Sequence, residues 1–535
     1  MNATVLQRLV DGLRVDGFHL KHTAAGPSFR GSVAVRGQQI RLRLNYQHDA
    51  YSEPPRVVVE NPKDLAPGVV AHLDEDNELC VVDRNAYVAD RYAAAEQARG
   101  IVAKAAEVLA RAGTQAAVDE IADEFPRHWG GRVIYLDAAP FVGFVKPRTG
   151  AAWAEFVRSD KQVPSPDPGG ISVVTTQRLS FHPGQSRPST FGELLDWASS
   201  WDPELADVIV NGLARQGPAD PHVFIHAPNG LVCFQLLSSQ RVARNLRSLA
   251  WRQLLRGRFG QKLPIKRLQG RRVDTAYILG TNSAAGTAPL GGKRIVLVGC
   301  GAIGGFLAHA LAQLGAGLDG GALLLVDDDD LSARNRVRHR LGGSHVGKKK
   351  ALACKESISE DWPELQVSAL PLKVEQCRSQ VMGADFIVEA TGEQSVGDLL
   401  NEWRIEATAA GGGPALLHAW IEGNGAVAQT YLSSDPQFGC YRCLQPQLDE
   451  APRYPALRSD ALNIVTTACG EAPFSPYGPA APMAAASLAA SHILDWSRGN
   501  GRPMLRGARL SIAETVDRKP TNPTKSDRCP ACQGS

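Results

Sequence analysis

The segment Lys293-Arg-Ile-Val-Leu-Val-Gly299-Cys-Gly301-Ala-Ile-Gly304 decides the fold of the C-terminal half of this chain. Its apolar, β-branched start predicts a buried strand, and residues Gly304 to Leu314 predict the helix that follows. The glycines between them are typical of the tight turn in a nucleotide-binding βαβ unit. Strand-like runs at Ala322–Val326 and Asp385–Ala390 alternate with helical segments. The pattern therefore predicts an α/β domain with a mostly parallel sheet.

A series of polar residues follows the predicted strand Ala322–Val326 and reduces the number of functions that fit the glycine turn. Its members are Asp327, Asp329, Asn335, Arg338 and Lys350. Many dehydrogenases share the glycine turn, so a nicotinamide-dependent oxidoreductase is the default interpretation of the turn alone. A dinucleotide site needs one acid for the ribose and has no use for the rest of the series. An adenylating site uses all of it, because an Asn, an Arg and a Lys hold the triphosphate while a carboxylate attacks the α-phosphorus.

The order Asp-x-Asp, Asn-x-x-Arg and Gly-x-x-Lys resembles the ThiF/MoeB and ubiquitin-activating enzyme family. The resemblance implies an α/β Rossmann-like adenylation domain that binds ATP, with Gly299, Gly301 and Gly304 in the nucleotide turn. It implies that Asp327 binds the ribose, that Asn335 and Arg338 contact the phosphates, and that Lys350 stabilises the transition state. Asp329 matches the second acid of the pattern.

The chain departs from this family at one position. The usual Ala-Thr-Asp-Asn, whose Asp assists Mg²⁺, is replaced by Ala390-Thr-Gly392-Glu393. Glu393 is the candidate for the missing carboxylate.

Two Cys-x-x-Cys pairs, Cys440 with Cys443 and Cys529 with Cys532, have the spacing of zinc ligands. The same pairs recur in the family, so the resemblance implies a zinc knuckle that binds structural Zn²⁺. The alternatives are unmetallated knuckles or one redox-active pair.

Cys469 stands between the two pairs in the small-residue stretch Thr466-Thr-Ala-Cys469-Gly. It resembles the family cysteine that takes the acyl group from the adenylate as a thioester, since a thiolate suits that transfer. The alternative is a buried structural cysteine. We interpret four further cysteines as structural: Cys233, Cys300, Cys354 and Cys377.

The first ~125 residues are predicted to form an α+β module. An amphipathic helix is expected near Val5 to Leu13, strands at 30–35, 39–44 and 56–59, and a helix over 93–112. Tyr51-Ser-Glu-Pro-Pro55 resembles the Tyr-Pro-x-x-Pro-Pro segment of ubiquitin-conjugating enzymes. The stretch from His72 to Cys80 resembles their His-Pro-Asn to active-site Cys segment.

That resemblance implies a conjugating-enzyme-like domain in which Cys80 carries the acyl group. The family's Asn is replaced by Asp74, so Asp74 or Asp83 is the candidate to support attack by lysine. A plain strand cysteine is the alternative for Cys80.

The predicted organisation is multidomain: residues 1–128 conjugating-enzyme-like, a mixed middle domain over 129–280, and the adenylation domain over 281–535. The middle is predicted to contain a hairpin, in which Val223–His226 and Leu231–Leu236 flank a Pro228-Asn-Gly230 turn. We assign it no chemistry.

The 535 residues carry a formal net charge of only +3, which does not predict a nucleic-acid-binding surface. No apolar run approaches the ~20 residues of a membrane span, and the N-terminus lacks a signal-peptide pattern. We expect a cytoplasmic protein without membrane or nucleic-acid partners.

Together the motifs predict an activating and conjugating fusion. It would adenylate the C-terminal glycine of a protein, form a thioester on Cys469, transfer the acyl group to Cys80 and conjugate it to a target amine. The order resembles the fused transferases of bacterial antiviral (CBASS) operons, which implies a cyclic-nucleotide synthase or a ubiquitin-like protein as partner, and a homodimer. The alternatives are a sulfur-carrier adenylyltransferase without conjugation, an oxidoreductase and a non-catalytic scaffold.

Overall fold

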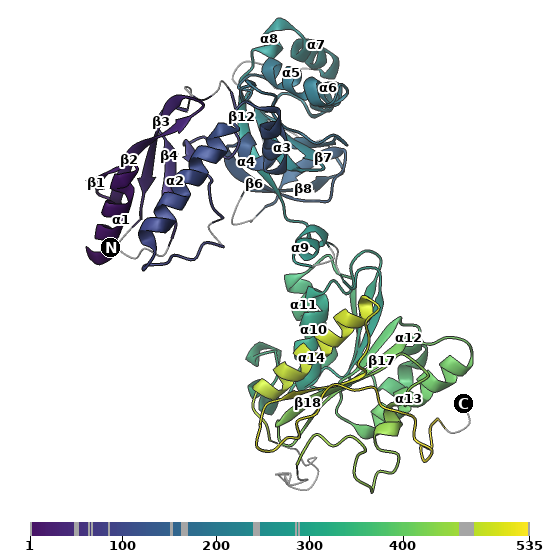
Figure 1. Cartoon of the computed structure of the whole chain (residues 1–535). Helices are drawn as coiled ribbons and strands as arrows, with labels where there is room; N and C mark the ends of the chain where they lie inside the picture. Colours follow the sequence, from purple (N-terminus) through teal and green to yellow (C-terminus); the bar gives the residue numbers. More distant parts are fainter. Residues whose placement is uncertain are drawn as a thin grey trace. The chain divides into compact units, whose positions relative to one another are not determined.

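The computed structural model describes residues 3–47, 53–62, 65, 68–83, 86–149, 154–161, 169–238, 247–283, 286, 289–458 and 476–532. Two compact units divide the chain, Met1–Asp274 and Thr275–Ser535 (Figure 1). The second unit therefore begins before the predicted boundary at 281, because the helix that opens it starts at Thr275.

The first unit opens with an antiparallel sheet of five strands in sequential order and two helices that pack on each other. The elements are α1 (Ala3–Val15), β1 (His19–Thr23), β2 (Gly26–Val35), β3 (Gln38–Asn45), β4 (Arg56–Val59), β5 (Glu78–Leu79) and α2 (Ala94–Ala110). The predicted N-terminal helix, the three strands and the later helix are thus confirmed. Leu9 and Leu13 of α1 join Leu42 of β3 and Ile101 of α2 in one apolar core.

A closed barrel forms the rest of the first unit, with strand order β10-β11-β12-β6-β8-β7-β9. Its strands are β6 (Arg132–Asp137), β7 (Gly143–Pro147), β8 (Glu155–Ser159), β9 (Gly170–Val174), β10 (His222–Ala227), β11 (Gly230–Leu236) and β12 (Ile265–Arg272). Its helices are α3 (Gln115–Asp123), α4 (Phe125–Trp129), α5 (Phe191–Trp201), α6 (Leu205–Gln216), α7 (Ser248–Arg256) and α8 (Arg258–Gln261). The predicted hairpin is confirmed, since Ala227 pairs with Gly230 across the turn.

The second unit is built on a seven-stranded sheet of order β15-β14-β13-β16-β17-β18-β19. The first five strands run parallel, as predicted, and the last two pair antiparallel. The strands are β13 (Arg294–Val298), β14 (Ala322–Val326), β15 (Val367–Leu370), β16 (Phe386–Glu389), β17 (Ala415–Glu422), β18 (Val427–Ser433) and β19 (Leu505–Arg509).

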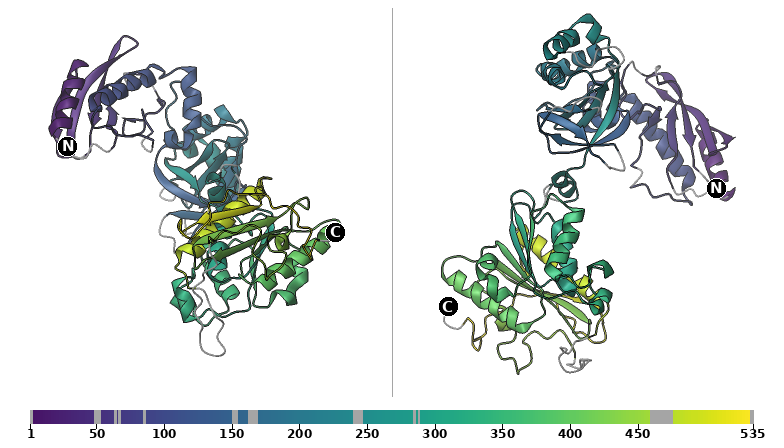
Figure 2. Two further views of the ribbon diagram at one scale, coloured as in Figure 1. Left: turned by 60° about the horizontal axis from the view of Figure 1, so that its bottom comes forward. Right: turned by 180° about the vertical axis from the view of Figure 1, so that it is seen from behind.

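Helices cover both faces of this sheet (Figures 1 and 2). They are α10 (Ala302–Gln313), α11 (Lys350–Asp361), α12 (Arg378–Met382), α13 (Gln394–Ala409) and α14 (Ala480–Ser497), while α9 (Thr275–Thr281) precedes the sheet. In β13, Ile295 and Leu297 face the layer of α10, α11 and α14, whereas Val296 and Val298 face α12 and α13. This alternation produces the three-layer α/β/α architecture that a strand buried on both faces predicts.

Short 3₁₀ turns complete the unit: η2 (Ala333–Val337), η3 (Gly343–His345), η4 (Val374–Cys377) and η5 (Tyr441–Leu444). Within the described ranges, no helix combines the length and hydropathy that crossing a bilayer requires.

Candidate functional site

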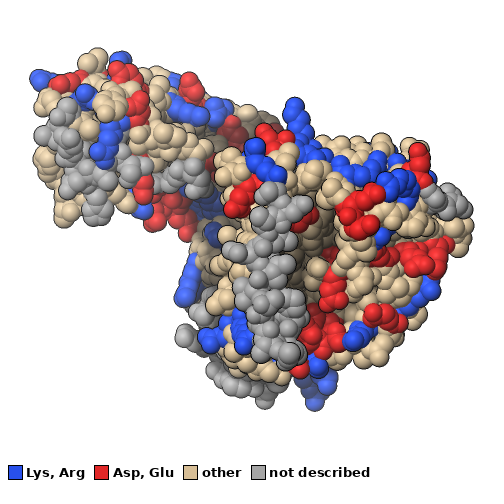
Figure 3. Space-filling view, turned by 90° about the horizontal axis from the view of Figure 1, so that it is seen from below, with Lys and Arg blue, Asp and Glu red and all other residues tan. Residues whose placement is uncertain are grey.

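A cavity of about 750 Å³ opens at the carboxyl ends of β13, β14 and β16. This is the edge at which open α/β sheets bind ligands. Acidic side chains gather beside a hollow on the lower face of the second unit (Figure 3). The carboxylates that line the cavity are Asp327, Asp328, Asp329, Glu375, Glu389, Glu393 and Glu422.

The glycine turn after β13 forms one wall of the cavity. Gly299 has φ +90°, and a Cβ there would lie 2.8 Å from the carbonyl carbon of Ala390. A Cβ on Gly304 would lie 1.8 Å from the oxygen of Gly299, so no side chain fits between turn and helix. Gly301 lines the cavity, and a Cβ there would meet nothing within 4 Å, which leaves open space beside its backbone for a ligand.

Asp327 lies at the end of β14, where two backbone N–H groups fix its carboxylate. Cys300 N donates to Oδ2 at 2.6 Å and Asp329 N donates to Oδ1 at 2.9 Å. Burial raises the pKa of Asp327, and the nearby Lys350 ammonium together with the N–H donors opposes this shift. Asp327 is thus a pre-oriented hydrogen-bond acceptor at the cavity wall.

Lys350 opens helix α11, and its side chain reaches back to the cavity. Nζ lies 2.7 Å from Oδ2 of Asp329, with the lysine side chain 11% exposed and the aspartate 71% exposed. The ammonium is therefore held at the cavity by an acid that itself remains open to solvent.

Arg338 and Asn335 occupy different positions relative to the cavity. Arg338 lines it, with its guanidinium carbon 5.2 Å from the centre of the Tyr477 ring. Asn335 is absent from the lining, and its Oδ1 accepts hydrogen bonds from N and Oγ of Ser332. The structure therefore gathers Asp327, Arg338 and Lys350, while Asn335 closes the η2 turn that precedes Arg338.

Glu393, the predicted replacement for the family's acid, lines the cavity beside Gly392. Gly392 has φ +74°, a conformation that favours glycine.

Sequence reasoning missed the far part of the cavity, which β17, β18, η5 and the segments around Tyr454 and Tyr477 supply. Its additional lining residues include Trp420, Glu422, Gln429, Tyr441, Tyr454 and Tyr477. Oε1 of Glu422 accepts from both Trp420 Nε1 and Gln429 Nε2 at 2.7 Å. The pairing of β17 with β18 brings Trp420, Glu422 and Gln429 together, and no sequence motif indicated it. Tyr441 lies within the first Cys-x-x-Cys pair, but that motif does not indicate a position at the cavity.

A buried acid also supports this wall. Glu389, 3% exposed, accepts from the N–H of Thr391 at 2.7 Å and lies 3.1 Å from Nδ1 of His418. The His418 ring stacks on Tyr441, with ring centres 3.8 Å apart. Glu389 thereby links the end of β16 to the aromatic side of the cavity.

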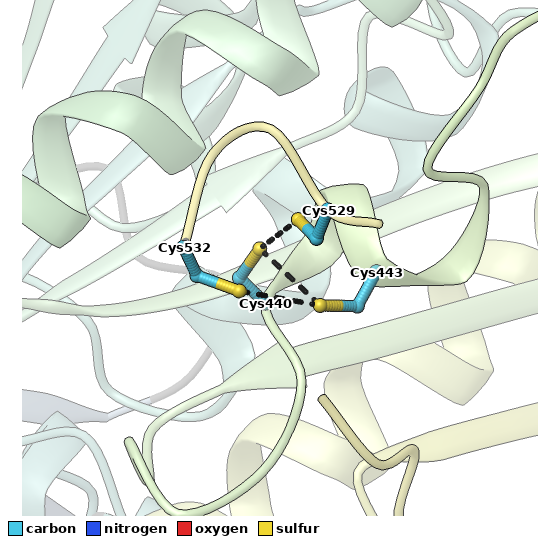
Figure 4. A group of neighbouring side chains, drawn as sticks. All are labelled: Cys440, Cys443, Cys529 and Cys532. Carbon is cyan, nitrogen blue, oxygen red and sulfur yellow. Dashed lines mark hydrogen bonds between the residues drawn. The ribbon is translucent and has the colours of Figure 1, made fainter. Parts of the chain in front are cut away.

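The four predicted zinc ligands come together (Figure 4). The Sγ distances are 3.8 Å for Cys440 to Cys443, 3.6 Å for Cys440 to Cys529, and 3.5 Å for Cys443 to Cys532. A tetrahedron of Zn–S bonds of about 2.3 Å has edges of about 3.8 Å. The hydrogen bond between the first two thiols lowers the pKa of Cys443 and raises the pKa of Cys440. The cluster suits structural zinc.

The remaining predicted cysteines differ in their surroundings. Cys233, Cys300, Cys354 and Cys377 are buried. The hydrogen bond with Cys354, together with burial, raises the pKa of Cys300. Cys469 lies outside the described residues.

Cys80 follows β5 and is half-buried. Its N–H donates to the carbonyl oxygen of His72 at 2.8 Å. Leu73 and Leu79 form an antiparallel bridge, and Oδ1 of Asp74 accepts from the N–H groups of Asp76 and Glu78. His72 and Cys80 therefore close a tight turn, and the carboxylate of Asp74 stabilises that turn from within.

Known proteins are similar to this chain in sequence. Residues 275–533 match the ThiF family. The chain is 29% identical over 506 residues to the ATP-dependent ubiquitin transferase-like protein Cap2 of Pseudomonas aeruginosa (strain BWHPSA011 / Pa011), covering 89% of each chain. This chain is a Cap2-like enzyme with a ThiF domain. A protein of the same name from Escherichia coli (strain TW11681) is 24% identical over 554 residues, covering 92% of this chain and 91% of the relative.

The chain also has a more distant relative. The adenylyltransferase and sulfurtransferase UBA4 of Yarrowia lipolytica is 24% identical over 186 residues, covering 34% of this chain and 44% of that protein. The ThiF family uses ATP, so the cavity of the second unit is the candidate nucleotide site.

Proposed function

We propose that the second unit adenylates the C-terminal glycine carboxylate of a protein at the cavity beside Gly299. The observation that carries this proposal is the convergence of Asp327, Arg338 and Lys350 on one cavity behind the glycine turn. Asp327 would accept from the ribose hydroxyls, Arg338 would hold phosphate, and Lys350 would neutralise charge that develops at the α-phosphorus. Asn335 would act through the turn that presents Arg338.

The chemistry balances without further reactants. A carboxylate oxygen of the glycine forms a bond to the α-phosphorus, and pyrophosphate leaves. The acidic lining would repel a free triphosphate and favours a divalent cation, so Mg²⁺ would enter with ATP and Glu393 is its candidate protein ligand. Zn²⁺ at the four cysteines would hold η5, and with it Tyr441, against the cavity.

The acyl group would then pass through two cysteines. The Cys469 thiolate attacks the acyl carbon and AMP leaves; the Cys80 thiolate attacks the thioester and the first thiolate leaves. An amine of a target protein would finally take the acyl group from Cys80. The first unit supports this assignment, because α1, a meander of strands, the His72 to Cys80 turn and α2 follow one another in the order expected of a conjugating enzyme.

We infer that the activated protein is a ubiquitin-like protein or a cyclic-nucleotide synthase, that the enzyme acts in antiviral defence in the cytoplasm, and that it works as a homodimer. Similarity over about nine-tenths of the chain to proteins named ATP-dependent ubiquitin transferase-like favours transfer of a ubiquitin-like protein. The weaker similarity to UBA4 supports the alternative, a sulfur-carrier adenylyltransferase in which the first unit only binds the carrier.

The test is to incubate the purified chain with ATP and candidate glycine-terminated proteins and to detect reductant-sensitive adducts. Wild type is compared with Cys469→Ala and Cys80→Ala. If each cysteine holds an adduct and loss of Cys469 removes both, the relay stands. If pyrophosphate exchange occurs but no adduct depends on Cys80, the sulfur-carrier alternative replaces it.

A further inference from the structure

The segment that leads to Cys80, residues 68–73, contributes side chains to two separate apolar cores of the first unit. Val69 and Ala71 pack in the core of the barrel and its helices, whereas Val70 and Leu73 pack in the core of the N-terminal sheet. The segment is thus fixed from the barrel side as well as by its own sheet.

The backbone of this segment packs closely against the loop between β9 and α5. The N–H of Val69 donates to the oxygen of Gln185 at 3.0 Å. A Cβ on Gly68 would lie 2.5 Å from that same oxygen, so the close approach requires glycine. Arg187, on the same loop, donates to His128 O at 2.6 Å and to Leu73 O at 3.4 Å.

The tip of the Cys80 turn is held by the barrel itself. Glu75 accepts a charged hydrogen bond from Arg267 of β12 and another from the N–H of Gly131 at 3.2 Å. Arg267 also donates to Trp129 O at 3.0 Å and to Pro188 O at 2.9 Å. The guanidinium is therefore oriented before it meets Glu75, which favours one position of the turn.

His72 is held from the helical side. Its ring Nε2 lies 3.5 Å from Oε2 of Glu120, and its ring Nδ1 lies 3.6 Å from Oε2 of Glu124. The backbone N–H of His72 donates to Nε2 of His128 at 3.3 Å. Burial lowers the pKa of His128 to about 3, so this ring stays neutral and its Nε2 remains an acceptor. Since Cys80 N–H bonds to His72 O, fixing His72 fixes the cysteine.

We propose that the barrel positions Cys80 for acyl transfer, with Arg187 and Arg267 as positioning residues that act through the His72 to Cys80 turn. This inference gives the middle of the chain a role and rests on the proposed function of Cys80 as acyl acceptor. In that step the Cys80 sulfur forms a bond to the thioester carbonyl carbon, and the donor thiolate leaves. The rate depends on the placement of the sulfur, and a displacement of about 1 Å can cost on the order of 100-fold.

The test uses the full chain with Cys469→Ala in the background, so that the proposed first acceptor is absent. The acyl probe is a glycine-terminated pentapeptide thioester of mercaptoethanesulfonate, and acylation of the Cys80 peptide is followed by mass spectrometry. Two substrate-independent measurements accompany it: alkylation of Cys80 by iodoacetamide, and hydrogen exchange of the amides in residues 72–80. The variants are Arg267→Met and, on the exposed side of the same ion pair, Glu75→Ala.

Controls match each variant. Asp76→Ala removes an exposed carboxylate from the same turn, and Arg256→Met breaks the ion pair with Asp207 between two helices of the same unit. Arg267→Lys keeps a cation facing Glu75, so its acylation rate is expected to lie between the rates of Arg267→Met and wild type.

We expect Arg267→Met and Glu75→Ala to slow acylation by about tenfold or more. Alkylation and amide exchange should both become faster, because the turn opens while the unit stays folded. The two controls should resemble wild type. Unchanged exchange and alkylation in both variants would overturn the positioning role. Failure of wild-type Cys80 to take any acyl group would instead overturn the proposed function. In that case the hydrogen-exchange rates would still show whether Arg267 and Glu75 hold the turn.

Discussion

Replacing Lys350 by Met tests the adenylation site most directly. The substitution keeps the length and most of the volume of the side chain and removes only the ammonium. Lys350 pairs with Asp329, which is 71% exposed, so water can solvate the acid that remains. Lys350 is itself buried, however, and its ammonium also opposes the burial that raises the pKa of Asp327, so we expect the free energy of unfolding to fall by about 1–3 kcal/mol while the unit stays folded.

The effect on catalysis should be much larger. The lysine side chain is only 11% exposed and lines the cavity, so its charge is poorly screened there. A unit charge about 4 Å from developing charge contributes about 4 kcal/mol at an effective dielectric of 20. Since about 1.4 kcal/mol corresponds to tenfold in rate, adenylation should slow on the order of 100- to 1,000-fold.

The assay is ATP–pyrophosphate exchange with a glycine-terminated substrate, alongside thermal unfolding of the same preparations. The neighbouring Lys349, 41% exposed and paired with Asp330, supplies the control Lys349→Met, which should retain exchange. Exchange by folded Lys350→Met within threefold of wild type would refute the role of the ammonium.

Three further predictions follow from the second unit. Gly304→Ala, whose Cβ would lie 1.8 Å from Gly299 O, should lower the free energy of unfolding by about 1–3 kcal/mol in chemical denaturation, whereas Gly301→Ala, with open space at its Cβ, should leave it near wild type. Cys529→Ser should abolish stoichiometric zinc in elemental analysis and lower the melting temperature. The control Cys377→Ser, outside the cluster, should retain the metal. Full zinc content in Cys529→Ser would contradict the zinc assignment. Burial lowers the pKa of His492 from 6.5 to about 4, so the unfolded chain binds a proton that the folded chain does not. The free energy of unfolding should be unaffected by this group above about pH 6.5 and should fall by about 2–3 kcal/mol towards pH 4, a dependence that urea titrations should find reduced in His492→Phe.

The parts of the site that lie close together in the sequence were predictable. The turn from Gly299 to Gly304 and the polar series from Asp327 to Lys350 flank successive strands, and parallel strands bring their carboxyl ends to one edge. The spacing of the two Cys-x-x-Cys pairs likewise indicated one metal site, although only the fold shows that the four sulfurs reach a common centre.

Only the tertiary structure revealed the contacts that join distant segments. The aromatic wall with Trp420 and Tyr441 depends on which strand pairs beside β17 and where η5 returns, and neither follows from local periodicity. The bond between Arg267 and Glu75 joins residues far apart in the chain, and no pattern around either one indicates it. Short-range sequence fixes turns and strands because their conformations depend on neighbouring residues. Contacts between elements depend on the register and packing of the whole chain, which is why the support for Cys80 emerged only from the fold.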